Sequence, residues 1–361
     1  MTVILIVFTA SIGLSLAAVA FVLRLSHKKA WYDHINERKI HKGDIPRLGG
    51  IGFAPAFILV AAVIIFTSGE VDSSIRFLPC LAALIITLIS GVCDDFRPMS
   101  PRYKLMLQLL AALCVIIPGF VFRRITYTDA GILSNVGHLG IPLTFLWIVG
   151  LTNAINFIDG VDGLAGGLSA LIALFFGLIF FSFSENSQSV LFCVSLFAVV
   201  LGFLVFNAPL PKAKIFMGDG GSQFLGFSLA LLPLLEGRDS PAALPVPYAA
   251  ALLAIPIFDT IAAVWRRIRD GRRIDSPDKF HMHHKLINLG LSARGVDAVL
   301  YSLQIVLGIL VFISIRLDGM LSVFFLAAAY IAATAFFAVI HFLNHAANSK
   351  KTETSGKHPP E

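Results

Sequence analysis

The stretch Val3–Leu23, VILIVFTASIGLSLAAVAFVL, decides the class of fold because it contains no charged residue. A helix rises about 1.5 Å per residue, so about 20 apolar residues cross a hydrocarbon core about 30 Å thick. A cleaved signal peptide would have a basic start and a shorter apolar stretch, and the opening Met1-Thr2-Val3-Ile4 has no basic residue. The stretch is therefore predicted to be an uncleaved first transmembrane helix.

The rest of the chain repeats this composition in long blocks. Of the 361 residues, 57% are hydrophobic and only 14% are charged, which is typical of an integral membrane protein. The predicted fold is all-α integral membrane with about 11 transmembrane helices, at 3–23, 49–67, 77–93, 104–122, 141–157, 163–183, 189–206, 222–235, 246–265, 298–316 and 319–343. One transmembrane domain is predicted over residues 1–347, followed by a disordered cytosolic tail over 348–361.

The loops between these helices form two alternating sets, and one set is far more basic. It carries 23 of the 28 Lys and Arg residues. Because basic loops stay in the cytosol, the N-terminus is predicted outside and the C-terminus in the cytosol. The same bias accounts for the net charge of +6, so the predicted partner is the lipid bilayer and no nucleic acid.

Nearly every polar cluster falls in the cytosolic set of loops, and the first is Asp94-Asp95. Adjacent carboxylates repel each other, and their position at a membrane edge is explained if a cation or a proton is handled there. A solvated turn is the alternative. Lys104 opens the next predicted helix and is available to meet a phosphate.

The second cluster is NAINFIDGVDGLAGG at residues 153–167. Its polar residues recur at every third position: Asn153, Asn156, Asp159 and Asp162. On one continuous helix, which turns about 100° per residue, the first and last would face opposite sides. Gly160 and Gly163 permit a break after Asp159, so the four side chains are predicted to converge on a wet cavity. An ordinary loop between helices is the alternative.

The third cluster is KIFMGDGGSQ at residues 214–223. Its glycines free backbone N–H groups, and the following helix N-terminus supplies a positive dipole end, which together suit a phosphate. Asp219 is predicted to hold the cation that bridges phosphate oxygens. A common glycine-rich turn is the alternative.

The fourth cluster, DKFHMHHKL at residues 278–286, lies in the most basic loop. Zinc fits poorly, because three packed imidazoles lack the usual ligand spacing and any nearby cysteine. Imidazole donors to a diphosphate, helped by the arginines of 266–273, fit better, although those arginines serve equally as orientation signals or lipid contacts. A fifth segment, HKGDIPRLGG at 41–50, either grips a lipid phosphate or anchors its helix.

Carboxylates, amides and glycine turns describe oxygen ligation, which suits Mg²⁺ or Mn²⁺. A bound metal also explains how an acidic site accepts an anionic substrate. At the boundary between cytosol and bilayer, such a site can join a nucleotide sugar to a lipid phosphate. The lipid phosphate would attack the phosphate next to the sugar.

Four of these strings resemble, in the same order, those of the polyprenyl-phosphate N-acetylhexosamine-1-phosphate transferases. The strings are Asp94-Asp95, NxxNxxDGxDGLAxG, Met217-Gly218-Asp219-Gly220-Gly221-Ser222, and HxHH followed by Lys285-Leu286. The form His281-Met282-His283-His284 is similar to the branch that transfers N-acetylglucosamine 1-phosphate to undecaprenyl phosphate. The branch that acts on N-acetylmuramoyl-pentapeptide has a different histidine arrangement and ranks second, with other UDP-N-acetylhexosamines as further donors.

The resemblance implies an Mg²⁺-dependent enzyme, with Mn²⁺ as a substitute. It would make undecaprenyl-diphospho-N-acetylglucosamine and UMP from UDP-N-acetylglucosamine, at the cytosolic face of a bacterial inner membrane. This would be the first membrane step of a cell-envelope glycan pathway. A homodimer is left open, and so is the choice between direct displacement and a covalent route through Asp94.

The resemblance also implies roles for individual residues. Asp94 would be the base near the lipid phosphate, and Asp95 would help to hold the metal site. Asp159 and Asp162 would line the nucleotide pocket, and Phe216 would contact uracil. The histidines would meet the diphosphate or the sugar. The predicted set is catalytic Asp94, Asp95, Asp159 and His281; substrate-binding Lys104, Asn153, Asp162, Phe216, His283 and His284; and metal-binding Asn156 and Asp219.

Two rival readings belong to other classes of membrane protein. An ion-coupled transporter places its polar residues near the midplane of the bilayer, whereas these lie at the cytosolic ends of the predicted helices. A CDP-alcohol phosphotransferase needs an Ala-Arg pair after its first Asp-Gly, and Asp159-Gly160-Val161-Asp162-Gly163 lacks it.

Overall fold

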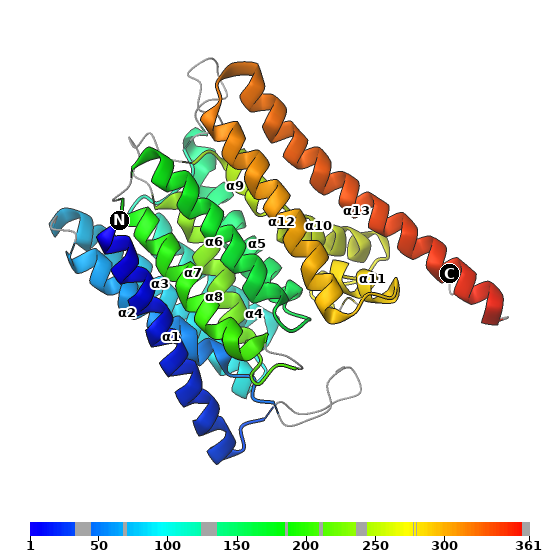
Figure 1. The fold of residues 1–361 in the computed structure, drawn as a ribbon, viewed down its shortest axis with the longest axis horizontal. Helices are drawn as coiled ribbons and strands as arrows, with labels where there is room; N and C mark the ends of the chain where they lie inside the picture. The colour runs from blue at the N-terminus through cyan, green and yellow to red at the C-terminus, as the bar shows by residue number, and fades with distance from the viewer. Residues whose placement is uncertain are drawn as a thin grey trace. The chain divides into compact units, whose positions relative to one another are not determined.

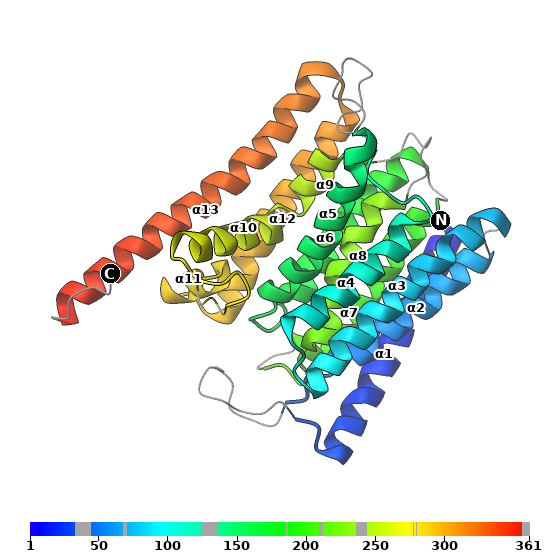
Figure 2. The ribbon, with the colours of Figure 1, turned by 180° about the vertical axis from the view of Figure 1, so that it is seen from behind.

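The computed structural model describes residues 1–32, 45–67, 71–123, 136–184, 187–208, 212–235, 244–276, 278 and 280–355, and within them all regular structure is helical. The chain divides into two compact units, Met1–Ala250 and Ala251–Glu361. Figures 1 and 2 show the helices of both units. The all-α integral membrane fold is thereby confirmed, and the domain predicted over 1–347 covers the first unit and the second unit as far as residue 347.

The first unit is a bundle of long apolar helices. They are α1 (Thr2–Lys29), α2 (Gly49–Thr67), α3 (Val71–Phe96), α4 (Pro101–Ile116), η1 (Gly137–Leu139), α5 (Gly140–Ile158), α6 (Leu164–Phe183), α7 (Gln188–Asn207), α8 (Gly218–Leu231) and η2 (Leu232–Leu234). Helix α8 packs against α2, α3, α5 and α6. Every residue of α8 except Asp219 is buried, so α8 is the central helix of this unit.

The number of spans differs from the eleven predicted. In the described residues, eight helices are long and apolar enough to cross a membrane, and a ninth span results if the bent pair α9–α10 crosses as one. The blocks at 104–122 and 222–235 form only α4, with 16 residues, and α8, with 14 residues. After the end of α4 come Pro118 and then Gly119, and the φ of Gly119 is +90°. After α8 comes the short 3-10 helix η2, which contains Pro233. The apolar sequence continues past the C-terminal ends of α4 and α8, although the two helices do not.

The N-terminus of α2 is joined to the segment that precedes α8. The Gly49 N–H donates to the Phe216 carbonyl and the Gly50 N–H to the Met217 carbonyl, each at 2.9 Å. A Cβ at Gly50 would lie 2.5 Å from the Cα of Gly221, so the two backbones are in direct contact. Small residues allow membrane helices to approach this closely.

Gly50→Ala is therefore expected to lower the thermal stability of the purified protein by about 2 kcal/mol or more, because backbone must move to admit the methyl group. The same shift would displace Asp219 and reduce any activity that depends on it. Gly150→Ala is the matched control, since no atom lies within 4 Å of a Cβ at Gly150. Equal melting temperatures for the two variants would contradict this account of the α2–α8 contact.

The second unit contains the end of α9 (Val246–Leu252) followed by α10 (Ala254–Arg269), α11 (Met282–Asn288), α12 (Ala293–Arg316) and α13 (Gly319–Ser355). The axes of α9 and α10 differ by 86° across a break of one residue, Leu253. The tail predicted to be disordered from residue 348 is instead helical through Ser355, and residues 356–361 lie outside the described part. The Asn348 side chain accepts a hydrogen bond of 2.8 Å from Asn288 of α11, which ties the helix end to its own unit.

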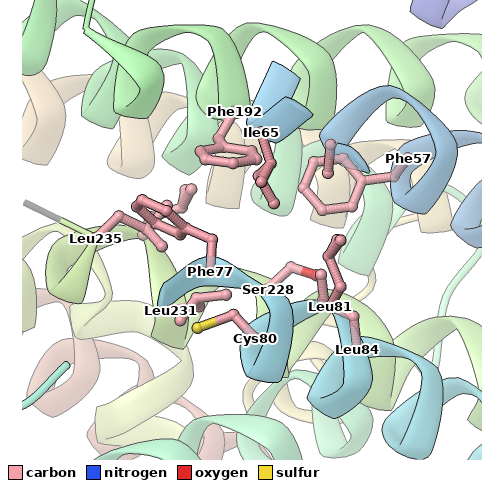
Figure 3. A pocket seen from close by; sticks show the side chains of 12 residues that line it. Phe57, Ile65, Phe77, Cys80, Leu81, Leu84, Phe192, Ser228, Leu231 and Leu235 are labelled. Carbon is pink, nitrogen blue, oxygen red and sulfur yellow. The ribbon is translucent and has the colours of Figure 1, made fainter. Parts of the chain in front are cut away.

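A small apolar cavity lies in the first unit among α2, α3, α7 and the end of α8 (Figure 3). It is lined by residues such as Phe57, Phe77, Leu84 and Phe192, and by no charged side chain. Leu84 precedes Asp94 on α3 by ten residues, which is about 15 Å of helix. The cavity is thus separate from the carboxylates and suits only an apolar group.

Candidate active site

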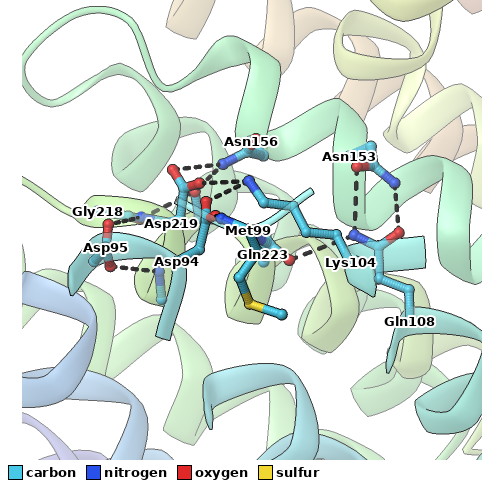
Figure 4. A network of polar contacts seen from close by, with 12 residues as sticks. Asp94, Asp95, Met99, Lys104, Gln108, Asn153, Asn156, Gly218, Asp219 and Gln223 are labelled. Atoms are coloured by element: carbon cyan, nitrogen blue, oxygen red, sulfur yellow. Dashed lines mark hydrogen bonds and ion pairs between the residues drawn. The ribbon is translucent and has the colours of Figure 1, made fainter. Parts of the chain in front are cut away.

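Asp219 is the centre of a polar network at the ends of four helices (Figure 4). Its Oδ1 accepts hydrogen bonds from Arg47 Nη2 at 2.6 Å and from Asn156 Nδ2 at 3.3 Å. Its Oδ2 accepts one from Lys104 Nζ at 3.2 Å, and Lys104 also pairs with Asp94. Residues from α3, α4, α5 and α8, with Arg47 from the segment before α2, therefore meet at one place.

Asp94 and Asp95 lie in the last turn of α3 and have different partners. Neighbouring residues on a helix point about 100° apart. Asp94 accepts the N–H of Met99, in the turn before α4, at 2.7 Å through Oδ1, and its Oδ2 pairs with Lys104 of α4. Its carboxyl group also contacts the Asp219 side chain. Asp95 faces α8, and its side chain is only 2% exposed. The helix thus separates two carboxylates that the sequence places side by side.

The Asp95 side chain caps the N-terminus of α8. Its carboxylate accepts the backbone N–H of Asp219 at 2.7 Å and that of Gly220 at 2.9 Å. A carboxylate is stabilised there by the free N–H groups and the positive end of the helix dipole. The N-terminal site that the glycine-rich string predicts for a substrate phosphate is therefore taken by the protein's own Asp95. What this turn offers to a ligand is the Asp219 side chain.

Gly91 explains how Asp95 reaches α8. The two residues are four apart on α3 and share one face of the helix. A Cβ at Gly91 would lie 2.5 Å from the Asp219 carbonyl oxygen and 2.5 Å from the Gly220 Cα. With glycine at this position, α3 and α8 touch backbone to backbone.

A second polar layer of amide side chains lies one turn deeper. Gln108 follows Lys104 by four residues on α4, Gln223 follows Asp219 by four on α8, and Asn153 precedes Asn156 by three on α5. Asn153 Nδ2 donates to Gln108 Oε1 at 2.8 Å, and Gln108 Nε2 lies 3.4 Å from Gln223 Oε1. Gln108 and Gln223 are 5% and 2% exposed, so this layer supports the carboxylates from below.

The break predicted after Asp159 is confirmed. Helix α5 ends at Ile158, Asp159 follows as its C-cap, and α6 begins after Gly163, whose φ is +89°. The four polar side chains do not all share one set of partners, however: Asn156 contacts Asp219, whereas Asn153 contacts Gln108. The pattern of every third residue could not show this division, because it depends on which helices pack against α5.

The nucleotide residues predicted from the resemblance lie around a loop held by Asn207. The buried Asn207 accepts the Gly163 N–H at 2.9 Å and donates to the Ile215 carbonyl at 3.0 Å. Asp162 accepts the Ala213 N–H at 3.4 Å. Half-buried Phe216 receives a hydrogen bond from Gly49 and donates its own N–H to the Pro46 carbonyl at 2.8 Å. Their roles toward uracil and the diphosphate stay predictions.

The histidine string belongs to the second unit. His281 is the N-cap of α11, and its Nδ1 lies 2.8 Å from Oδ2 of the buried Asp259. His283 is 3% exposed, and its Nδ1 has no hydrogen-bond partner in the described structure. Three arginines of the basic loop pair with carboxylates of the same loop: Arg266 with Asp278, Arg269 with Asp270 and Arg273 with Asp275. These carboxylates offset much of the charge that was predicted to meet a diphosphate.

His283 is expected to make the protein less stable in acid. Burial, and then the neighbouring His284, lowers the pKa of His283 to about 3. An unfolded histidine has a pKa of about 6.5, so below that pH the unfolded chain binds a proton that the folded chain does not. Stability is therefore full above about pH 6.5 and falls as the pH drops, by about 2 kcal/mol at pH 5 from this residue.

Thermal melting of the purified protein at pH 7.5 and pH 5 measures this effect. His283→Gln should reduce the difference between the two melting temperatures. His345→Gln, at an exposed position of α13, should leave it unchanged. The same pH dependence in wild type and His283→Gln would rule out a buried neutral imidazole at this position.

The motifs did not assign three residues that complete the network. Arg47 lies in the HKGDIPRLGG segment, whose role was open; residues 41–44 of that segment lie outside the described part. Gln108 and Gln223 are amides inside or at the edge of apolar blocks. Polar side chains in such blocks usually have partners or functions, and this was the available signal.

Buried carboxylates, amides and two cations meet at the ends of apolar helices, which is an arrangement that an integral membrane enzyme with charged substrates requires. Residues 77–236 match the model of glycosyl transferase family 4. The chain belongs to this family, in agreement with the resemblance of its motifs.

The relatives agree with one another in the activity that their names describe. A probable undecaprenyl-phosphate N-acetylglucosaminyl 1-phosphate transferase of Bacillus subtilis (strain 168) is 36% identical over 310 residues, covering 85% of this chain and 83% of the relative. An undecaprenyl-phosphate alpha-N-acetylglucosaminyl 1-phosphate transferase of Escherichia coli (strain K12) is 31% identical, covering 76% and 74%. A decaprenyl-phosphate N-acetylglucosaminephosphotransferase of Mycobacterium leprae (strain TN) is 35% identical, covering 73% and 72%.

Proposed function

We propose that this protein transfers N-acetylglucosamine 1-phosphate from UDP-N-acetylglucosamine to undecaprenyl phosphate, releasing UMP. The observation that carries the proposal is the convergence of Asn156, Arg47 and Lys104 on the carboxylate of Asp219. Carboxylates for a cation and basic side chains for phosphates are what the transfer of a phosphate-linked sugar requires. The names of all three relatives support the choice of sugar, and the names of the Bacillus subtilis and Escherichia coli relatives support undecaprenyl phosphate as the lipid.

Magnesium is part of the proposal, with Mn²⁺ as its substitute. Within the described residues, no group of three His, Cys, Asp or Glu side chains has the geometry of a complete metal site. The donor set still fits Mg²⁺, which keeps several waters and needs only one or two carboxylates beside substrate phosphates. Three carboxylates, Asp94, Asp95 and Asp219, face two cations, so the network has room for further positive charge. Asp219 and Asn156 would hold the ion, which when bound neutralises charge on phosphate oxygens.

The reaction proceeds by attack of an oxygen of the lipid phosphate on the phosphorus next to the sugar. A bond forms between that oxygen and this phosphorus, and the bond to the oxygen bridging the two phosphates breaks. UMP leaves with the bridging oxygen. A phosphomonoester with a second pKa of about 6 is already mostly dianionic at neutral pH, so a strong base is not required. Lys104 and Arg47 orient the phosphates and offset their charge.

The contacts of Asp94 support direct displacement over a covalent intermediate. Its Oδ1 accepts the Met99 N–H and its Oδ2 pairs with Lys104, so both oxygens are engaged. In this proposal Asp94 positions Lys104 beside the lipid phosphate. Rapid mixing decides the point: release of UMP before lipid is added would indicate an aspartyl intermediate.

The site is proposed to face the cytosol of a bacterium, in its inner membrane, with the N-terminus outside and the C-terminus inside. With α4 and α8 counted as membrane-crossing helices, the bias of 23 of 28 Lys and Arg toward one set of loops supports this orientation. A reporter that is active only in the cytosol, fused after residue 361, tests it. Light scattering of the purified protein tests the homodimer.

Release of labelled UMP from UDP-N-acetylglucosamine, by purified protein in detergent, tests the function. Release is expected only when undecaprenyl phosphate and Mg²⁺ are both present. UDP-N-acetylgalactosamine and UDP-N-acetylmuramoyl-pentapeptide are the competing donors, and preference for either would replace the proposed sugar. No release from any donor would contradict the transferase.

A further inference from the structure

Asp259 and His281 form a buried pair in the second unit. Asp259 lies on α10 and is 2% exposed, and His281 is 6% exposed. Asp259 Oδ2 lies 2.8 Å from His281 Nδ1, and Asp259 Oδ1 accepts the Met282 N–H at 2.8 Å. One carboxylate therefore contacts both the ring of the first histidine in the string and the first N–H of α11.

Capping of α11 does not by itself explain the carboxylate. A neutral oxygen, such as that of Ser or Asn, accepts one N–H equally well and avoids the cost of burying a charge. No Lys or Arg lies within ion-pair distance of Asp259 among the described side chains, whereas Asp278 in the adjoining loop has Arg266 at 2.6 Å. The charged second oxygen of Asp259 is directed only at the imidazole.

This contact determines which nitrogen of His281 carries a proton. A carboxylate accepts hydrogen bonds, so the Nδ1 of His281 must be protonated and must donate to Asp259. The ring is also held at the start of α11, because its own backbone is the N-cap. Contact with a ligand must then be made through Nε2. His283, whose Nδ1 has no such partner in the described structure, lacks this constraint.

We propose that Asp259 is a positioning residue, which holds His281 through Nδ1–H and presents Nε2 to the nucleotide sugar. The inference that His281 meets the nucleotide sugar rests on the function proposed above. The holding of the ring does not, because it follows from the contacts of Asp259 alone. The experiment below measures the two separately.

Asp259→Asn is the decisive variant because it keeps the shape and the cap. The amide oxygen must still accept the Met282 N–H, so the amide NH₂ faces His281 and donates where the carboxylate accepted. Nδ1 must then accept, and the proton moves to Nε2. Nitrogen-15 NMR of histidine-labelled protein in detergent reports this directly, because protonated and unprotonated ring nitrogens have widely separated shifts. His281→Gln identifies the signals of His281.

Wild type is expected to show His281 protonated at Nδ1, and Asp259→Asn is expected to show it protonated at Nε2. Asp278→Asn is the matched control: it removes a carboxylate that accepts the Phe280 N–H at 3.0 Å but makes no hydrogen bond to His281. It should leave His281 protonated at Nδ1. An Nε2–H tautomer in wild type, or an unchanged His281 in Asp259→Asn, would overturn the positioning role.

UMP release by the same variants measures the consequence for transfer. With the tautomer reversed, kcat is expected to fall about 10²-fold or more, with KM changed less, and thermal stability is expected to stay near wild type. In a His281→Gln background, Asp259→Asn should reduce kcat little further, because each change already disrupts the same Asp259–His281 pair. An additive loss in the double variant would show that Asp259 acts by another route. If wild type releases UMP from no donor, the proposed function fails, while the NMR result still decides the positioning.

Discussion

Asp219→Asn is expected to reduce kcat/KM for UMP release by about 10³-fold or more, while the protein still folds. The Asp219 carboxylate accepts from Arg47, Lys104 and Asn156, so one substitution removes the charge on which the network converges. Folding should survive because the backbone N–H of residue 219 remains bonded to Asp95. Asparagine also retains one oxygen that can accept a hydrogen bond.

Kinetics at several Mg²⁺ concentrations and a melting curve measure this prediction together. The variant should stay impaired at saturating UDP-N-acetylglucosamine, with a higher Mg²⁺ requirement and a melting temperature within a few degrees of wild type. Asp318→Asn, at an exposed carboxylate between α12 and α13, is the matched control and should behave as wild type. Near-normal turnover in Asp219→Asn would remove the central residue of the proposed site.

Asp95→Ala is expected to abolish activity as well, but by a different route. The substitution leaves the N–H groups of Asp219 and Gly220 without an acceptor at a position that is 2% exposed. A buried unsatisfied N–H costs about 1–3 kcal/mol, and the favourable charge at the helix N-terminus is lost too. The first turn of α8 should loosen, and the Asp219 side chain with it.

Stability separates this role from metal binding. Asp95→Ala should lower the melting temperature in the absence of Mg²⁺, and excess Mg²⁺ should not restore activity. Asp95→Asn retains one acceptor and should lose less stability than Asp95→Ala. If Asp95→Ala melts like wild type and is rescued by Mg²⁺, Asp95 is a metal residue, as the motif resemblance implied, and not the cap of α8.

The local motifs predicted the members of the site better than its connections. Asp94, Lys104, Asn156 and Asp219 do meet, and the break after Asp159 is present. Asn153 was grouped with them but belongs to the amide layer with Gln108. The partner of an amide depends on which helix lies opposite, and no spacing within one segment contains that information.

Sequence by itself determined that this chain is a helical membrane protein, because about 20 apolar residues without charge have no other stable way to satisfy their backbone in a bilayer. It also predicted several of the polar residues that meet around Asp219. Only the tertiary structure decided that Asp94 and Asp95 serve different helices, that α8 is a short central helix, and that Asp259 is bound to His281. The functional group of each side chain is written in the sequence. Its hydrogen-bond and ion-pair partners are set by packing between segments that lie far apart in the chain.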